Sequence, residues 1–474
     1  MKIKTGNRAQ TEVRMKKIVV WLLTLVCAFG MAGCKPVITD KETDGDYEVN
    51  IDLDQNTEGT LSILVPSTDG GRESDIIDVL AKGFKAIYPN VTVVKHADMI
   101  TDEMYMDTIG TLVQSESMPD LVYTNTAMYY YLVSKKVVVN LEPYFKATEE
   151  AGTLDMADYY SEYFNMATYE GKRYIMPRNA DTVVTYFNRS MLEEAGIKTS
   201  GADRDPRLSN DWTWEDFISV CEDLVAFWDR DRTKYANYYC IRQTLFDWES
   251  VWNPIMQSVG AEAYRDGEVA IDSEETREFI ALYKELIDKK IAPTWDSGSN
   301  ARLINGSAAF EFASNGPSEM QKYEVLKDNF DVLTFPLVGG AETGRIGTGF
   351  AGWGISSTSE NRDLAWAFLH YMISEEGQLA MCSSGVSTTP SLLRSLSEEK
   401  TWAKDFKHLN LDAFMAHGEN KVTPAYFKGF DPSHMFDIQY ALQTFTRNCL
   451  TSNTTAEECI RLAKDSLANA VAEI

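Results

Sequence analysis

The clearest structural pattern in the chain is residues 61–123, which read LSILVPSTDGGRESDIIDVLAKGFKAIYPNVTVVKHADMITDEMYMDTIGTLVQSESMPDLVY. Short apolar runs at 61–65, 91–94 and 120–123 alternate with two stretches of helical periodicity. Ser74 is suited to cap the first helix, and the second covers about 102–115. Strands and helices that alternate in this way predict a parallel sheet with right-handed crossovers, so this part of the chain is α/β.

The ends of these strands supply the first candidate binding residues. In open α/β sheets, ligands bind beyond the carboxyl ends of the strands. Asp69 and Arg72 follow the first strand, and Asn125 follows the third. A solvated, glycine-rich turn is an equally good interpretation of the segment that contains Asp69 and Arg72.

Further strand and helix signals continue to the end of the chain. Residues 182–187 form an apolar strand pattern, followed by a helical segment at 189–195 that Gly196 closes. Thr213 with Asp216 has the spacing of a capping box. More helices are expected over 361–374 and from Thr455 to the C-terminus.

The N-terminus reads as a targeting segment. Six basic residues and one acidic residue lie in residues 1–33, and an uninterrupted apolar run covers 18–29. This run is shorter than the roughly 20 residues of a membrane-spanning helix and fits a secretory signal. Met31-Ala32-Gly33-Cys34 is similar to a bacterial lipobox, which implies lipidation of Cys34; an ordinary signal peptide is the alternative. Translation from Met15 would give the signal a more usual length.

Residues 34–58 are expected to link the lipidated cysteine to the folded body. The segment is polar, rich in Asp and Glu and poor in aromatic residues. Such a composition is typical of a flexible acidic tether. Attachment to the outer face of a membrane through the lipid on Cys34 follows from this interpretation.

The charge of the chain excludes some classes of function. The formal net charge is −26, and because residues 1–33 carry +5, the chain from Cys34 onward carries −31. A body of this charge repels the phosphates of nucleic acids, so nucleic-acid binding is not expected. Hydrophobic residues make up 44% of the chain, which is enough for a sizeable core, and the length suggests two or three domains.

Cysteine and histidine spacing indicates no metal site, and no cofactor is expected. The cysteines beyond Cys34 are odd in number, which does not fit a disulfide framework: Cys221, Cys240, Cys382, Cys449 and Cys459. A local bridge between the last two and buried free thiols both remain open. Residues 229–240 are superficially similar to a calcium loop, but they lack its sixth-position glycine and its twelfth-position acid.

Several segments together resemble one family, the extracellular solute-binding proteins of ABC importers, in the carbohydrate-binding, maltose-binding-protein-like group. No single segment is decisive, but their order along the chain matches the family. The segments are GKRYIMP at 171–177, YFNRSMLEEAGI at 186–197, WTWEDF at 212–217, NGSAAF at 305–310, FPL at 335–337, GWGIS at 352–356, and AWAFL at 365–369 with SEEGQ at 374–378.

The resemblance implies a periplasmic-binding-protein type II fold, with two α/β lobes joined by a hinge and a cleft between them. Carried over to this sequence, the first lobe holds 59–179 and 346–425, and the second holds 180–345 and 426–474. The family's tryptophan after "NGP" is Ser318 here, and an aromatic residue early in the penultimate helix falls near Gln439. Stacking on sugar rings must therefore use other aromatic residues.

The hinge and its neighbourhood supply the remaining polar candidates. A sugar site needs carboxylates and amides for hydroxyl groups, and flat aromatic rings for the apolar faces of the sugar. Asp181 follows Pro177 at the expected hinge, where the family often places a sugar-binding polar residue, although a hinge hydrogen bond would also explain it. Asn315 and Phe350 are weaker candidates.

Three tryptophans complete the candidate site. Trp353 lies between two glycines and resembles a pocket aromatic of the family. Trp295 lies in a loop, where a large exposed aromatic ring needs a reason. Trp248 and Trp252 are spaced i, i+4, which usually indicates core packing, and Trp248 is the better binding candidate because it lies nearer the helix start.

The expected function is therefore a lipid-anchored, monomeric receptor that captures a carbohydrate, in particular an oligosaccharide, and delivers it to an ABC permease. Hinge closure around the ligand needs no covalent chemistry, so no catalytic residue and no enzyme activity are expected. A sugar-sensing receptor subunit would use the same binding chemistry. A glycoside hydrolase is disfavoured, because abundant carboxylates decide nothing and no local nucleophile motif occurs.

Overall fold

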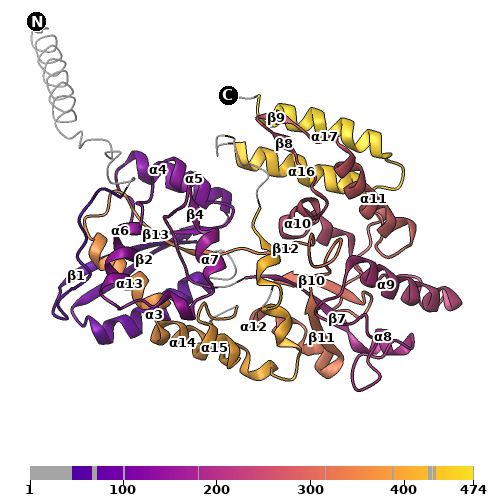
Figure 1. The fold of residues 1–474 in the computed structure, drawn as a ribbon, viewed down its shortest axis with the longest axis horizontal. Coiled ribbons are helices and arrows are strands. Elements are labelled where there is room, and N and C mark those ends of the chain that lie inside the picture. The colour runs from indigo at the N-terminus through magenta and orange to yellow at the C-terminus, as the bar shows by residue number, and fades with distance from the viewer. Residues whose placement is uncertain are drawn as a thin grey trace, which may run out of the picture.

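The computed structural model describes residues 45–66, 72–99, 102–179, 181–314, 316–386, 389–424, 430 and 434–472. The expected signal peptide, Cys34 and the first part of the tether lie outside the described residues, as do Asp69 and Asn315. Within the described residues, no helix is both long and apolar enough to cross a membrane. Figure 1 shows two lobes, the first mainly in indigo and purple with orange segments such as α13, and the second running from magenta to yellow.

The first lobe is built on a five-stranded sheet in the order β2-β1-β3-β13-β6. Strands β1, β2 and β3 are parallel, as predicted, and β13 pairs antiparallel with both β3 and β6. The strands are β1 Gly59–Pro66, β2 Val91–Met99, β3 Leu121–Asn125, β13 Ala351–Ile355 and β6 Met176–Pro177. The helices are α3 Arg72–Ile87, α4 Asp102–Gln114, α5 Tyr129–Ser134, α6 Glu142–Glu150, α7 Ser161–Met166 and α13 Arg362–Ile373.

The second lobe has a three-stranded antiparallel sheet in the order β10-β7-β11. Its strands are β7 Val183–Asn188, β10 Phe310–Ser314 and β11 Phe330–Thr334. Thr213 and Asp216 form the predicted capping box of α9. The helices are α8 Arg189–Glu194, α9 Trp214–Trp228, α10 Glu249–Val259, α11 Glu274–Asp288, α12 Pro317–Lys322, α16 Met435–Cys449 and α17 Ala456–Ala470.

The chain crosses between the lobes at the junction of β6 and β7, again before β13, and after β14 (Lys421–Val422). Strand β12 (Ile346–Gly347) pairs in parallel with β14, so two of the crossing segments are held together by backbone hydrogen bonds. These segments run across the middle of Figure 1, where β12 is labelled. The expected fold class, two α/β lobes with a hinge, is confirmed.

One helix start differs from the sequence prediction. Helix α3 begins at Arg72, two residues before the Ser74 that was expected to cap it. The hydroxyl and carbonyl oxygens of Ser74 accept hydrogen bonds from Lys95 Nζ, at 2.8 and 3.2 Å, so Ser74 connects the helix to β2 instead.

The boundary of the first lobe also differs, because residues 402–414 pack on the second lobe. Trp402, Phe406 and Phe414 form a separate buried cluster with Tyr186 of β7 and Phe330 of β11. Helices α14 (Glu375–Ser384) and α15 (Arg394–Glu398) lead into this segment along the lower edge of both lobes in Figure 1. The expected range 346–425 of the first lobe therefore ends too late.

The later part of the expected tether is packed against the first lobe. Tyr47, Val49, Ile51 and Leu53 are partly buried on its core, while the residues between them are exposed. The acidic composition of the segment hides this alternation of apolar and polar residues. We call residues 45–58 the strap.

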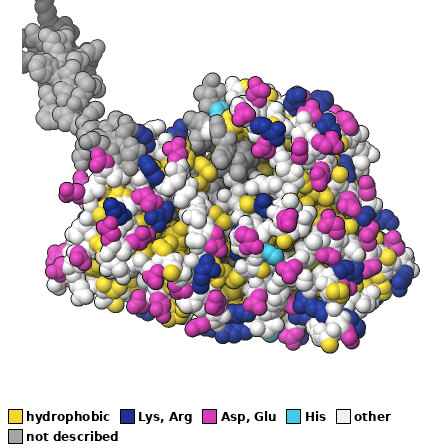
Figure 2. All heavy atoms as spheres, in the orientation of Figure 1, with side chains coloured by type: hydrophobic (Ala, Val, Ile, Leu, Met, Phe, Trp, Pro, Cys, Tyr) yellow, Lys and Arg dark blue, Asp and Glu magenta, His cyan; other side chains and the backbone are white. Residues whose placement is uncertain are grey.

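Many acidic side chains lie on the surface of the molecule (Figure 2), whereas the described cysteines are buried. Figure 2 shows acidic side chains scattered over both lobes on the face that it presents. The cysteines within the described residues are buried free thiols, so Cys449 and Cys459 are not bridged: Cys221, Cys240, Cys382, Cys449 and Cys459.

Candidate functional site

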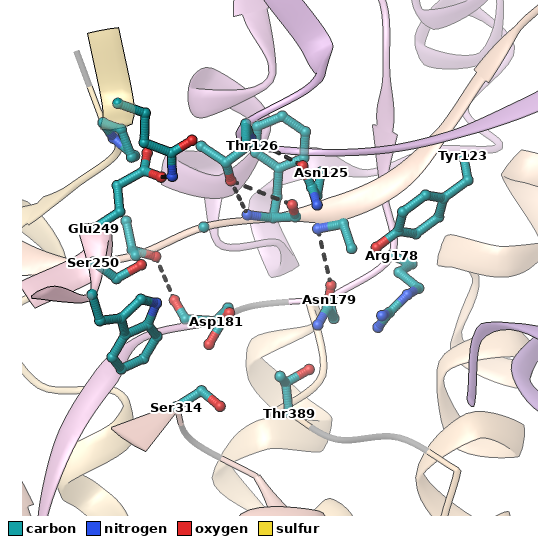
Figure 3. A pocket seen from close by; sticks show the side chains of 18 of the residues that line it. Tyr123, Asn125, Thr126, Arg178, Asn179, Asp181, Glu249, Ser250, Ser314 and Thr389 are labelled. Atoms are coloured by element: carbon teal, nitrogen blue, oxygen red, sulfur yellow. Dashed lines mark hydrogen bonds between the residues drawn. The ribbon is translucent and has the colours of Figure 1, made fainter. Parts of the chain in front are cut away.

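A cavity of about 490 Å³ lies between the lobes, and both lobes contribute to its walls (Figure 3). We call it the main cavity. The first lobe and the crossing segments supply Glu73, Tyr123, Asn125, Thr126, Arg178, Asn179, Asp181, Thr348 and Phe350, and the second lobe supplies Trp248, Glu249, Ser250, Ser314, Phe436, Gln439 and Gln443. Its volume is in the range of small-molecule sites.

Asp181 lies in the wall of this cavity, where the chain passes from β6 to β7. Its backbone carbonyl accepts a hydrogen bond from the hydroxyl of Thr348. Its Oδ1 atom is buried and accepts no hydrogen bond from the described residues. Burial raises the pKa of the Asp181 carboxyl to about 6, against the opposite effect of a backbone hydrogen bond and of the nearby charges of Arg178 and Lys421. A ligand hydroxyl could satisfy this oxygen.

Arg178 and Glu73 form a buried ion pair at the same wall. The guanidinium Nε lies 3.0 Å from Glu73 Oε2, and Nη2 contacts Oε1, so the pair is bidentate. The pair connects the first turn of α3 to the segment after β6. Since Arg178 is already bound to Glu73, its charge is largely neutralised for a ligand.

The second lobe supplies an aromatic ring and a carboxylate at the start of α10. Trp248 is the N-cap residue of α10 and is half-buried against the core of that lobe. Glu249 follows it and accepts a hydrogen bond from Gln439 Nε2 at 2.5 Å. This contact links α10 to α16, so the position of the Glu249 carboxylate depends on both helices.

Helix α16 contributes one aromatic ring and two amides to the main cavity, none of which was among the predicted site residues. Phe436, Gln439 and Gln443 line the main cavity at the i, i+3 and i+7 spacing of one helix face. Phe436 is 40% exposed and Tyr440 is 64% exposed. The aromatic residue of this face is Phe436, one helical turn before Gln439, and helical periodicity applied to this segment indicates that the two share a face.

The structure brings three of the predicted site residues to the main cavity and places two elsewhere. Asn125, Asp181 and Trp248 line it, and so does the weaker candidate Phe350. The Oδ1 atom of Asn125 accepts hydrogen bonds from the backbone N–H groups of Ala127 and Met128, which fixes the loop after β3.

The expectations for Trp353 and Trp295 do not agree with the structure. Trp353 is fully buried in the sheet of the first lobe, and its ring lies 5.6 Å from the ring of Tyr123. Trp295 packs on the second lobe, with the Arg447 guanidinium 5.3 Å from its ring centroid, and it is not among the residues that line the main cavity. Trp252 is a core residue, as its spacing suggested. Arg72 begins α3, but its side chain lies outside the described part of the molecule.

Comparisons with known proteins agree with this architecture. Residues 80–409 match the family model described as bacterial extracellular solute-binding protein. The sugar-binding protein MalE from Xanthomonas citri superposes with a TM-score of 0.71 at 16% identity, covering 87% of this chain and 98% of that one.

Two further solved structures have similar folds. An ABC substrate-binding protein from Listeria monocytogenes in complex with cycloalternan has a TM-score of 0.65 at 18% identity, covering 87% of this chain and 99% of its own. The GacH receptor of Streptomyces glaucescens, solved unliganded and with acarbose, has a TM-score of 0.63 at 19% identity, covering 88% of this chain and 99% of its own. At these identities the likeness concerns the fold.

Proposed function

The chain belongs to the bacterial extracellular solute-binding proteins, and on this premise we propose that it is the carbohydrate-binding component of an ABC importer. The family implies an extracytoplasmic location. We further propose that Cys34 is lipidated and that the protein delivers its ligand to a membrane permease. Cys34 and residues 35–44 lie outside the described part of the chain, so this attachment rests on the sequence alone.

One observation carries the proposal: the main cavity combines carboxylates, amides and aromatic rings that come from both lobes. Sugar hydroxyl groups donate hydrogen bonds to carboxylates such as Asp181 and Glu249, and such charge-assisted bonds are stronger than neutral ones. The rings of Trp248 and Phe436 offer surfaces for the apolar faces of a sugar. The sugars named for two of the solved relatives, cycloalternan and acarbose, are consistent with this ligand class.

The mechanism that we propose is closure of the lobes around the ligand. A ligand that contacts Asn125 of the first lobe and Glu249 of the second makes all of its contacts only when the lobes are close together. Binding then shifts the population toward the closed state by as much as the ligand favours that state. The closed form would present a surface from both lobes to the permease. This mechanism uses the cavity residues for recognition and assigns none of them a covalent step.

Calorimetric titration of the full chain in mild detergent tests the proposal. The panel holds mono-, di- and oligosaccharides together with amino acids, polyamines and short peptides, and the ligand is recovered afterwards for mass analysis. We expect a saccharide to bind with micromolar or tighter affinity and to be recovered intact. Recovery of cleaved sugar would contradict the receptor mechanism, and binding of only an amino acid, a polyamine or a peptide would contradict the ligand class.

A further inference from the structure

A second cavity, of about 390 Å³, adjoins the main cavity within the second lobe. Trp248 and Ser314 line both cavities, so the two cavities are neighbours at these residues. We call the second cavity the side pocket. Arg242, Arg302 and Tyr323 are among its other lining residues.

The two cavities differ in the charge of the residues that line them. Among the described residues that line the main cavity, Arg178 is the only basic one and is bound to Glu73, whereas Glu73, Asp181 and Glu249 are acidic. This arrangement makes the main cavity unfavourable for an anionic group and favourable for hydroxyl donors.

The side pocket holds three basic side chains and two acidic ones. Arg242 Nη2 lies 2.9 Å from Glu311 Oε1, and Lys322 contacts the carboxylate of Glu319. Arg302 is exposed in the wall of the side pocket and forms no ion pair with the described residues. The side pocket therefore has one positive charge in excess, in a chain whose net charge is −26.

A second observation also points to an anion. The Nε–H group of Arg242 is buried and has no hydrogen-bond acceptor among the described residues, although Nη2 of the same guanidinium is paired. A buried donor without an acceptor costs free energy, and an oxygen atom of a ligand would satisfy it. A guanidinium matches the planar or tetrahedral oxygens of carboxylate, sulfate and phosphate groups especially well.

We propose that the side pocket recognises an anionic substituent of the saccharide ligand, while the main cavity holds its neutral, hydroxyl-bearing part. This inference rests on the proposed function. The substituent is a carboxylate, sulfate or phosphate group, all of which offer the same acceptor oxygens to Arg242 and Arg302. The carboxylates of the main cavity would repel such a group, so they fix the direction in which the ligand lies across Trp248.

Matched saccharides test the inference. Calorimetric titrations of the full chain compare neutral oligosaccharides with oligouronides of the same length and with sulfated and phosphorylated forms of the same sugars. We expect one anionic series to bind about tenfold more tightly than its neutral counterpart, with an affinity that falls as salt is added. The series that shows this preference identifies the anionic group.

Substitution of Arg302 tests whether the preference arises in the side pocket. Arg302→Gln is expected to weaken binding of the preferred anionic saccharide about tenfold and to remove its advantage over the neutral form, and Arg302→Lys should keep part of it. Arg265→Gln is the matched control, because Arg265 is exposed in β8 (Tyr264–Arg265) and pairs with Glu262 at 2.6 Å. Equal melting temperatures of the variants would verify that they are folded.

The possible failures can be told apart. If a neutral saccharide binds as tightly as every anionic form, or if Arg302→Gln leaves the preference intact, the inference is wrong and the proposed function stands. If no saccharide of either kind binds, both the inference about the side pocket and the proposed function are wrong.

Discussion

The carboxyl group of Asp181 is buried in a way that costs stability when it is ionised. It lies in the wall of the main cavity, its Oδ1 accepts no hydrogen bond from the described residues, and burial raises its pKa to about 6. The ordinary pKa of an aspartate is about 4, so the folded protein holds this proton more tightly than the unfolded chain does. Stability from this group is therefore lost as the pH rises from about 4 through about 6.

Asp181→Asn is expected to affect stability and binding in opposite directions. At about pH 7.5 the variant should be more stable by about 1–2 kcal/mol, because asparagine has no charge to bury, and the difference should fall to roughly a third at about pH 4.5. Its affinity for the saccharide ligand should fall about tenfold. Chemical unfolding at the two pH values and a calorimetric titration measure these effects. A variant that binds as the wild type does would show that Asp181 has no contact with the ligand.

The pH dependence of ligand binding follows from the same group. An ionised Asp181 accepts a hydroxyl hydrogen bond more strongly than a protonated one, so the affinity should fall several-fold as the pH drops from about 7.5 to about 5. The affinity of the Asp181→Asn variant should not change with pH over this range. Calorimetric titrations over a series of buffers measure the affinity at each pH. If the affinity of both proteins depends on pH in the same way, another group is responsible for the dependence.

Single residues could be predicted from the sequence where a rule of topology applied. The rule that ligands bind beyond strand ends points to Asn125, and the position at the hinge points to Asp181; both residues line the main cavity. The resemblance of Trp353 to a pocket aromatic of the family does not predict its position, because its ring is fully buried. In the structure, Gly352 and Gly354 make room for the backbone of Met176 and the side chain of Val138, while Trp353 is buried in the core.

At the scale of elements, the exposed face of α16 is the main feature that the structure adds. Phe436 lines the main cavity, and Tyr440 is exposed one turn further along the helix. The alternation in the strap, from Tyr47 to Leu53, is the other pattern that composition concealed. Both segments have a periodic pattern of side chains. Whether the patterned face packs on a core or lines a cavity depends on the surface opposite it, and the local sequence does not specify that surface.

Phe436→Ala is expected to lower the affinity for the saccharide roughly tenfold, because it removes a ring surface from the main cavity. Asp437→Ala is the matched control, since Asp437 is the exposed neighbour on the same helix. Calorimetry of both variants gives the comparison. Equal losses in the two would indicate a general effect on α16, and no loss in Phe436→Ala would exclude a role for its ring in binding.

Tyr47→Ala is expected to destabilise the first lobe by about 1–2 kcal/mol without a change in ligand affinity. The Tyr47 hydroxyl donates a hydrogen bond to the backbone carbonyl of Asn140, and its ring lies 5.9 Å from the ring of Tyr144. Urea unfolding measures the effect, with Glu48→Ala, an exposed position of the strap, as control. If the two variants unfold alike, the strap contributes nothing to stability.

At the scale of the whole molecule, the hinge brings together segments that are distant in sequence. Lys421 of β14 is buried, and its Nζ contacts the hydroxyl of Tyr163 at 2.9 Å and the carbonyl of Phe414 at 3.2 Å. Burial lowers the pKa of Lys421 to about 8, opposed by nearby carboxylates that include Asp181. The order of segments in the sequence predicted two lobes, but the long-range packing of residues 402–414 on the second lobe could not be predicted from local patterns.

Gly347→Ala is expected to weaken ligand binding although Gly347 does not line the main cavity. A Cβ atom at this position of β12 would lie 1.9 Å from the backbone oxygen of Ser250, so the contact between the hinge and α10 must shift. Gly110→Ala in α4 is the matched control, because a Cβ there meets nothing within 4 Å. Calorimetry and melting temperatures separate a binding defect from misfolding. Unchanged binding by a folded Gly347→Ala protein would mean that the contact between the hinge and α10 does not control how the lobes are positioned.

Whether a saccharide is held between the two lobes can be decided by a crystal structure of the complex with the tightest ligand of the panel. We expect the ligand in the main cavity, in contact with Asp181, with a residue of the first lobe such as Asn125, and with a residue of the second lobe such as Trp248 or Glu249. A ligand that lies outside this cavity, or that touches only one lobe, would exclude binding by closure of the lobes.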